Sequence, residues 1–372
     1  MSHPDVVSLF MELASIPSPP GRERDVADRV VAYLRSLGVA VDEDDAGTRI
    51  GASAGNLLAR LEPTDGAGAA ICLCAHLDTV PPTAAIDPVL ADGVIRNAQE
   101  TILGADNKAA VAVMLEAVRR VREEGRAHAG IELVFTPKEE TGLEGAKELD
   151  VGRLAADVGF VYDHAAPIGA VVAVAPSSVS IDAVFRGRAA HAGMHPEEGR
   201  SAVAAAARAI ADLRLGRIDD ETTANVGVIA GGTARNIVPD HCVVEAEARS
   251  RDEAKLAEVV QEMADSFAFA GSLAECDVDV QLEEKYRGYR FRPDDPPLRL
   301  AFAALERSGF EPRAIEAGGG ADANVFNARG LPCANLANGM ARIHSAEEHI
   351  TVADLEAMVD VTLALVDAAR NG

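Results

Sequence analysis

The chain contains no tryptophan, and aromatic residues make up only 4% of its 372 residues. Its hydrophobic core must therefore be built mainly from alanine, valine, leucine and isoleucine. Basic residues are also scarce, because 35 Lys and Arg stand against 59 Asp and Glu, which gives a net charge of −24. This excess of negative charge argues against nucleic acid and anionic membranes as partners, since both attract basic surfaces. It is also typical of a well-solvated, soluble surface.

The sequence also lacks the features of secreted and membrane-spanning proteins. Its five cysteines are scattered without the spacing of a disulfide framework, which indicates a reducing, cytoplasmic environment. The first residues have neither the basic start nor the apolar run of a signal peptide, so we expect no leader. No apolar stretch reaches the roughly 20 residues that cross a bilayer, so no membrane span is predicted.

The chain does have the composition of a globular protein with a substantial core. Hydrophobic residues make up 48% and charged residues 25% of the sequence. In its first part, apolar runs alternate with amphipathic stretches, which is the pattern of an α/β sheet covered by helices. Strands are predicted at residues 39–43, 56–61, 71–75, 93–96, 131–135 and 159–164, and helices at 4–13, 23–37 and 109–122.

The pattern changes at about residue 175. An order of strand, helix, strand, strand, helix and strand follows, which is that of a ferredoxin-like unit. The α/β pattern then resumes with a helix at 297–308, a glycine-rich loop at 318–324, a strand at 332–336 and a closing helix at 352–369. We therefore predict an α/β fold in two domains, with residues 1–175 and 289–372 forming one and residues 176–288 an inserted α+β domain.

Polar side chains stand where the predicted α/β strands end. His76 and Asp78 directly follow the strand at 71–75, and ligands tend to bind outside the carboxyl ends of such strands. An imidazole and a carboxylate one residue apart suit a metal ligand and the group that orients it. Taken alone, this short motif carries a substantial risk of a false match.

Further acids and a second histidine follow other elements, and they strengthen the interpretation: Asp106, Glu139, Glu140, Asp163 and His344. Imidazoles and carboxylates form the ligand set of Zn²⁺, Co²⁺ or Mn²⁺. Buried acids without partners are costly, so we expect cations between them. Two metal ions about 3.5–4 Å apart would lower the pKa of a shared water to about 7 and polarise a carbonyl. A carboxylate outside the metal shell would then act as general base.

Five motifs in this order, A-H-L-D-T-V-P-P, G-A-D-N-K-A, T-P-K-E-E-T-G, V-Y-D-H and I-H-S-A-E-E, resemble those of the M20 family of dinuclear zinc peptidases and deacylases. The peptidase T-like (tripeptide aminopeptidase-like) branch is the most similar. The resemblance implies a three-layer catalytic domain of the zinc-peptidase type, with the insertion as a lid that also dimerises in some relatives. It implies a cytoplasmic two-metal enzyme, with Zn²⁺ expected ahead of Co²⁺ or Mn²⁺, that cleaves short, tripeptide-like substrates from the amino end.

The resemblance also implies the roles of the first metal ligands. His76 binds one metal and Asp78 holds the orientation of that imidazole. Asp106 bridges both metals, and the peptide bond after it is expected to be cis. Asp163 completes the first metal site. The structural alternatives are an N-cap for Asp106 and a helix cap or surface acid for Asp163.

The remaining carried-over roles concern the paired glutamates and the late histidine. The resemblance implies that Glu139 is the general base and that Glu140 and His344 bind the second metal. The alternative for the two glutamates is a solvated acidic pair before a turn. For His344 it is a structural histidine, in which case His349 would take its place as ligand.

The resemblance further implies substrate-binding residues in the insertion. His191 matches the family histidine that contacts the oxyanion or substrate, from the neighbouring subunit in dimeric relatives. Asn236 would donate to a carbonyl, and Arg235 would clamp a carboxylate. The alternatives are a surface histidine and a structural turn with an exposed arginine. In the glycine-rich loop, Asp322 and Asn324 are further pocket candidates.

Two rival functions remain at this point. An N-acyl amino-acid deacylase or a carboxypeptidase would use the same metals, and Arg235 on a substrate carboxylate would favour either one. A catalytically idle metal-binding scaffold is the rival from another class. The presence of every expected ligand and of the base argues against it.

Overall fold

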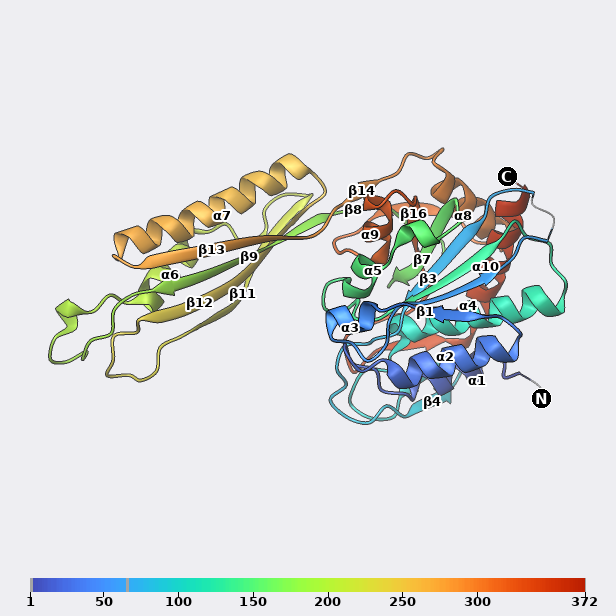
Figure 1. Ribbon diagram of the computed structural model, residues 1–372, viewed down its shortest axis with the longest axis horizontal. Helices are drawn as coiled ribbons and strands as arrows, with labels where there is room; N and C mark the ends of the chain where they lie inside the picture. The colour runs from blue at the N-terminus through green and yellow to red at the C-terminus, as the bar shows by residue number, and fades with distance from the viewer. Residues whose placement is uncertain (1–2, 65–66, 372) are drawn as a thin grey trace. The chain divides into compact units, whose positions relative to one another are not determined.

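The structure, a computed structural model, describes residues 3–64 and 67–371. The chain divides into two compact units (Figure 1). The larger unit runs up to Ala173 and takes in Arg290–Ala317 and the chain from Ala321 onward. The inserted unit consists of Val174–Tyr289 together with the short segment Gly318–Gly320.

The larger unit is organised around a nine-stranded sheet with the order β1-β2-β6-β3-β7-β16-β8-β14, and β15 pairs with β8. The central strands are parallel, since β3 pairs in this way with β6 and β7, and β16 with β7. Every residue of β3, β6 and β16 is buried, as expected for strands that are covered on both faces. The strands are β1 (Val41–Glu43), β2 (Leu57–Leu61), β3 (Ile71–His76), β6 (Ile131–Thr136), β7 (Val158–His164), β8 (Ala170–Ala175), β14 (Tyr289–Arg290), β15 (Arg313–Glu316) and β16 (Cys333–Ala337).

The helices of the larger unit form two groups, and within each group the helices contact the sheet or one another. In one group α4 packs on β3 and β7, α10 packs on α4 and α8, and α1 packs on α4. In the other group α9 packs on β7 and β16, α5 on α9, and α3 on α5. The helices are α1 (Val6–Ala14), α2 (Arg24–Ser36), α3 (Ala46–Ile50), α4 (Ala105–Glu123), α5 (Glu144–Glu148), α8 (Pro296–Arg307), α9 (Asp322–Ala328) and α10 (Val352–Asn371).

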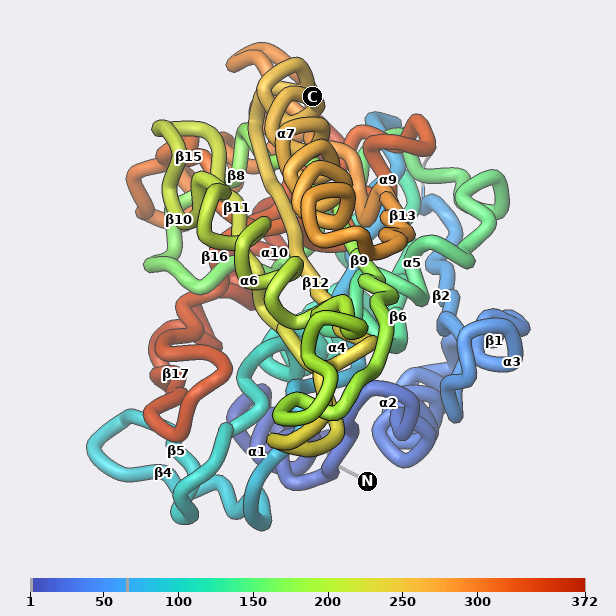
Figure 2. The backbone as a smooth tube through the Cα atoms, turned by 90° about the vertical axis from the view of Figure 1, so that its left-hand side faces the viewer, coloured from blue at the N-terminus to red at the C-terminus, as the bar shows by residue number. Residues whose placement is uncertain are grey.

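The larger unit also contains a small antiparallel sheet with the strand order β17-β5-β4. Figure 2 shows these three segments together, although β17 is far from the other two in the sequence. Its strands are β4 (Pro88–Ala91), β5 (Val94–Asn97) and β17 (His349–Thr351). Because β17 pairs with β5, this sheet anchors the chain directly after the predicted ligand His344.

The inserted unit is an antiparallel sheet in the order β10-β11-β12-β9-β13. Its four long strands and two helices follow the predicted ferredoxin-like order, and α6 and α7 pack against this sheet and each other. The α/β fold class with an inserted α+β unit is therefore confirmed. The elements are β9 (Ser177–Arg186), α6 (Ala202–Asp212), β10 (Gly216–Arg217), β11 (Thr222–Gly231), β12 (His241–Ser250), α7 (Glu253–Leu273) and β13 (Asp277–Tyr286).

One expectation about local structure was wrong. The glycine-rich segment 318–324 is not all loop, because α9 begins at Asp322. The backbone N–H of Ala321 donates to Oδ1 of Asn324, which satisfies a donor at this helix end and keeps the side chain buried. The helix expected at 109–122 lies within α4, and Asp106 and Asn107 before it have non-helical dihedral angles.

The core of the inserted unit offers a test of its packing. Phe267 is fully buried, and its ring meets that of Phe185 edge to face with centroids 6.0 Å apart. We expect Phe267→Ala to lower the free energy of unfolding by about 3–5 kcal/mol, because it leaves a cavity in this core. Chemical denaturation measures the change. Phe269→Ala on the same helix is the matched control, since Phe269 is 63% exposed and its loss should change stability by at most about 0.5 kcal/mol. Equal effects for the two variants would contradict the packing argument.

Candidate metal centre

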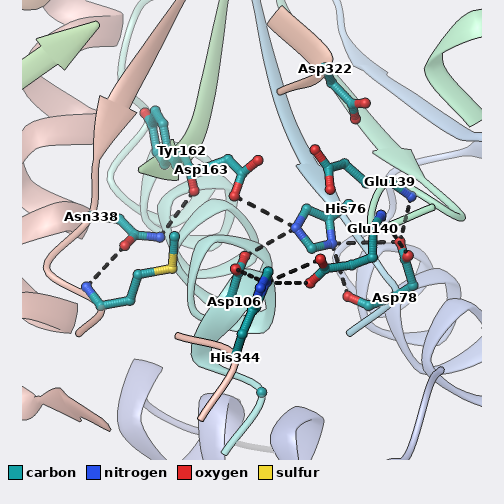
Figure 3. Close-up of polar contacts among 12 residues, drawn as sticks. His76, Asp78, Asp106, Glu139, Glu140, Tyr162, Asp163, Asp322, Asn338 and His344 are labelled. Carbon is teal, nitrogen blue, oxygen red and sulfur yellow. Dashed lines mark hydrogen bonds and ion pairs between the residues drawn. The ribbon is translucent and has the colours of Figure 1, made fainter. Parts of the chain in front are cut away.

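The parallel strands bring the predicted ligands to one edge of the main sheet. β3, β6 and β7 run in the same direction, so their carboxyl ends lie together. His76 is the last residue of β3, and Asp163 is near the end of β7. The segment after β6 carries Glu139 and Glu140, and Figure 3 shows their side chains close to His76.

His76 lies at the centre of the cluster and is 2% exposed. Its Nδ1 is 2.9 Å from the backbone carbonyl oxygen of Asp78, which can only accept a hydrogen bond, so Nδ1 carries a proton. Its Nε2 lies 3.1 Å from Oδ1 of Asp106 and 3.6 Å from Oδ1 of Asp163. In a neutral imidazole this Nε2 would present a lone pair to two carboxylates, so a cation between them would satisfy all three groups.

Asp106 connects two imidazoles through its two oxygens (Figure 3). Its Oδ1 faces His76, and its Oδ2 is 3.2 Å from Nε2 of His344. The same Nε2 of His344 is 3.1 Å from Oε2 of Glu140. The peptide bond between Asp106 and Asn107 is cis, as the resemblance implied.

Asp78 contacts both the imidazole of His76 and the backbone of the paired glutamates. One of its carboxylate oxygens is 3.5 Å from Nδ1 of His76. The two oxygens also accept hydrogen bonds from the backbone N–H groups of Glu139 and Glu140, at 3.0 and 3.1 Å. Because Asp78 is fully buried, these contacts hold the backbone of the paired glutamates against the end of β3.

Two asparagines, Asn335 in β16 and Asn338 directly after it, bind backbone groups of Tyr162, Asp163 and Met340. Oδ1 of Asn335 accepts from the backbone N–H of Asp163, and Nδ2 of Asn335 donates to its carbonyl, both at 2.8 Å. Asn338 donates to the carbonyl of Tyr162 at 3.0 Å and accepts from the N–H of Met340 at 3.1 Å. His344 itself has a φ of 60°, a conformation that is costly for a residue with a side chain and that marks functional segments.

The charges in the cluster perturb one another strongly. Burial and the neighbouring Asp106 raise the pKa of Asp163 to about 8. Burial and Asp163 raise the pKa of Glu139 well above its usual range. Hydrogen bonds to Asp106 and Glu140 raise the pKa of His344 to about 10. Burial disfavours the charged imidazolium of His76, but the carboxylates of Asp106, Asp163 and Asp78 outweigh it and hold that pKa well above its usual value.

The donor set fits divalent cations. Two groups of side chains could each hold an ion, because the possible ligand atoms within each group lie within 4.8 Å of one another. One group is His76 with Asp106 and Glu140, and the other is His76 with Glu139 and Asp163. His344 adds a nitrogen to the first group through its contacts with Asp106 and Glu140. With Asp78, five carboxylates stand beside two imidazoles, so negative charge remains even with both histidines protonated. Carboxylates packed this closely are neutralised by protons, as the raised pKa values of Asp163 and Glu139 show, or by divalent cations, which this donor set fits.

The predicted substrate-binding residues lie in the inserted unit and are exposed. His191 forms an isolated bridge with Ile237, and the N–H of Ala192 donates to the carbonyl of Asn236 at 2.9 Å, so His191 and Asn236 are neighbours. Nδ1 of His191 accepts from the N–H of Gly193 at 3.2 Å, which leaves Nε2 as the donor of the neutral imidazole. Arg235 stands beside Asn236 in the same turn.

Two buried acids near the centre make contacts that the sequence interpretation did not predict. Asp322, a pocket candidate there, is 1% exposed and accepts a hydrogen bond of 2.5 Å from the hydroxyl of Thr136 at the end of β6. Burial raises the pKa of Asp322 to about 6, and Figure 3 shows its carboxyl facing that of Glu139. Glu348 is also buried, and it contacts the segment of Asp106. Local spacing alone could not reveal these contacts, because they join residues more than 180 positions apart.

The inserted unit holds a further residue that sequence reasoning missed. Arg249 is half-buried on β12, and its Nη2 donates to Glu247 at 2.9 Å. Its buried Nε has no hydrogen-bond partner among residues 3–64 and 67–371. An unpaired guanidinium nitrogen suits a carboxylate.

An α/β sheet whose strand ends gather imidazoles and carboxylates is typical of a metal-dependent hydrolase. Similarity to known proteins narrows this class. The model of Peptidase family M20/M25/M40 matches residues 72–368. The protein therefore belongs to this family of metallopeptidases.

Individual relatives cover nearly the whole chain. The uncharacterized protein YqjE of Bacillus subtilis (strain 168) is 37% identical over 97% of both chains. The crystal structure of aminopeptidase PepT from Bacillus cereus ATCC 10987 has 39% identity and a TM-score of 0.88, with 98% of each chain covered. That of a tripeptidase from Staphylococcus aureus subsp. aureus Mu50 has 34% identity and a TM-score of 0.93, with 99% of this chain and 98% of the other covered. These similarities confirm the peptidase T-like branch.

The part of the chain that the structure describes contains no candidate transmembrane helix. Within residues 3–64 and 67–371, no helix is both long and apolar enough to cross a bilayer.

Proposed function

We propose that this protein is a two-metal aminopeptidase that removes the first residue from short, tripeptide-like substrates. The observation that carries the proposal is the position of His76, whose Nδ1 is engaged by the Asp78 carbonyl while its Nε2 faces the carboxylates of Asp106 and Asp163. An aminopeptidase and a tripeptidase among the similar structures support the substrate class.

The ligands that we propose divide into two sets that share Asp106. His76 and Asp163 would hold one ion, and Glu140 and His344 the other. Two divalent ions in these sets would lower the pKa of a water molecule and polarise the carbonyl of the scissile bond. Imidazole and carboxylate donors suit Zn²⁺ first and also accept Co²⁺ or Mn²⁺.

The protein's own groups would carry the proton transfers. Glu139 would accept a proton from the attacking water and deliver it to the leaving amine, since a buried carboxylate with a raised proton affinity is suited to both steps. Asp78 would keep Glu139 in place through the backbone N–H bonds and would orient His76. His191 and Asn236 would donate hydrogen bonds to the substrate carbonyl, with Nε2 of His191 as the free donor.

A second candidate function is compatible with Arg249, whose Nε has no hydrogen-bond partner in the described part of the chain. This guanidinium, or that of the exposed Arg235, would bind a terminal carboxylate. An N-acyl amino-acid deacylase or a carboxypeptidase needs such a group next to the bond that it cuts. A tripeptidase would use it at the far end of its substrate, so carboxylate binding by itself does not separate the three activities.

A substrate panel tests the proposal. The protein is stripped with a chelator and assayed with free tripeptides, N-acetylated tripeptides, C-amidated tripeptides and N-acyl amino acids, before and after addition of Zn²⁺, Co²⁺ or Mn²⁺. We expect no turnover without metal, and release of the first residue from free tripeptides once metal is restored. Cleavage of N-acetylated substrates or N-acyl amino acids in preference would instead support the second candidate. Full activity of the stripped protein would contradict both.

We further propose that the inserted unit, predicted as residues 176–288, acts as a lid and forms a homodimer. The exposed apolar side chains of this unit, among them Val228 and Ile229 on β11, support a protein contact there. A cytoplasmic location is supported by its cysteines, since all five are free and buried.

A further inference from the structure

Glu348 connects the two segments that carry Asp106 and His344. Its side chain is 2% exposed and accepts three backbone hydrogen bonds. Oε2 accepts from the N–H groups of Leu103 and Gly104 at 2.7 and 2.8 Å, and Oε1 accepts from the N–H of Asp106 at 3.0 Å. A carboxylate is suited to this task because both of its oxygens only accept.

Glu348 also satisfies a backbone N–H group at the start of α4. The N-cap residue of this helix is Gly104, which has no side chain to satisfy the free N–H groups of the first turn. An aspartate this close to a helix start could itself accept from free N–H groups, which would turn its carboxylate toward the backbone. Glu348 instead accepts from the N–H of Asp106 in the first turn and from those of Leu103 and Gly104 just before it, and its negative charge suits the positive end of the helix dipole. The carboxylate of Asp106 is therefore available to the imidazoles of His76 and His344.

The backbone around Glu348 is itself held by strand pairing. Glu348 directly precedes β17, in which Ile350 pairs with Ile95 of β5. The backbones of Ala341 and His349 exchange two hydrogen bonds of 3.0 Å, which close the loop that carries His344. The base of the His344 loop is thus tied to the backbone of Asp106 by a single buried side chain.

We propose that Glu348 is a positioning residue for both metal ions, because it holds the Asp106 backbone and the His344 loop in register. This inference rests on the metal centre proposed above and adds a residue that does not itself touch the ions. Loss of a group that orients a metal ligand commonly costs about 10–100-fold in metal affinity.

The test compares Glu348→Gln with wild type and with Glu347→Gln. Glutamine keeps the size of the side chain, but its amide NH₂ would face a backbone N–H and lose at least one of the three bonds. Glu347 is the matched control, since it is adjacent, 76% exposed in its side chain and 3.9 Å from Arg342 in a surface pair. Metal affinity is measured by competition with a chromogenic chelator, metal content by elemental analysis, and folding by circular dichroism and Tm.

We expect Glu348→Gln to bind metal about 10–100-fold more weakly and to regain turnover in excess metal, while Glu347→Gln matches wild type. If Glu348→Gln does not fold, Glu348→Asp, which keeps the charge on a shorter side chain, should show the same weakened and rescuable binding. Wild-type affinity in whichever variant folds would overturn the inference and leave the metal centre standing. A wild-type protein that binds no metal would overturn the proposed function itself, together with this inference.

Discussion

The Glu139→Gln variant is expected to lose about 10²–10⁴-fold in turnover of a tripeptide, the usual contribution of a general base. Glutamine has nearly the size of glutamate but cannot accept the proton of the attacking water. The backbone position of residue 139 should persist, because its N–H, and not its side chain, is bound by Asp78. The ligands proposed for the two ions are also unchanged, so metal content should stay at the wild-type level.

Steady-state kinetics and elemental analysis of the same preparation measure both quantities. Glu148→Gln is a suitable control, because Glu148 pairs with Arg49 at the surface and such pairs contribute about 0–1 kcal/mol. Unchanged turnover in Glu139→Gln would show that another group accepts the proton. Loss of metal together with turnover would show that Glu139 is a ligand, as its place in a group with His76 and Asp163 allows.

Asp106→Asn is expected to release both metal ions and to abolish measurable turnover. One carboxylate contacts both imidazoles, through Oδ1 toward His76 and Oδ2 toward His344. Asparagine keeps one oxygen and places an NH₂ group where the other stood, so at least one imidazole loses its acidic partner. Breaking a buried charge pair costs about 3–5 kcal/mol. At about 1.4 kcal/mol per factor of ten, this corresponds to roughly 10²–10³·⁵-fold in affinity.

The Asp163→Asn variant tests whether Asp106 binds both ions, because Asp163 is proposed to bind only one. Asp163 lies 3.6 Å from His76, and its substitution should weaken only the ion bound there. Metal titrations of the two variants should therefore differ, with Asp106→Asn losing two strong sites and Asp163→Asn losing one. The assignment of Asp106 as a bridge fails if both variants retain one tightly bound ion.

Much of this molecule could be predicted from local patterns. The strand at 71–75 is a continuous apolar run closed by His76 and a proline pair, and a buried parallel strand needs just such a run. The inserted unit was recognisable from its element order, which the structure confirms. Short elements such as α3, α5 and β17 were not predicted, since three to five residues carry too little periodicity to be distinguished from loop.

The roles of the individual site residues stay predictions, although the structure brings His76, Asp106, Glu140, Asp163 and His344 within reach of shared cations. The inserted unit's His191 and Asn236 lie next to each other, which their separation of 45 positions did not show. The glycine-rich segment was misjudged because glycine content suggested a loop, whereas the buried Asp322 begins a helix.

The sequence by itself determined which chemistry is available, because it places acids and imidazoles directly after the apolar runs that become parallel strands. It also determined the fold class, since element order follows from hydrophobic periodicity. Only the tertiary structure decided how these groups are held. Asp78 binds the backbone of Glu139 and Glu140 across 61 and 62 positions, and Glu348 binds that of Asp106 across 242. Such contacts depend on how the chain is packed, and no local spacing of residues encodes them.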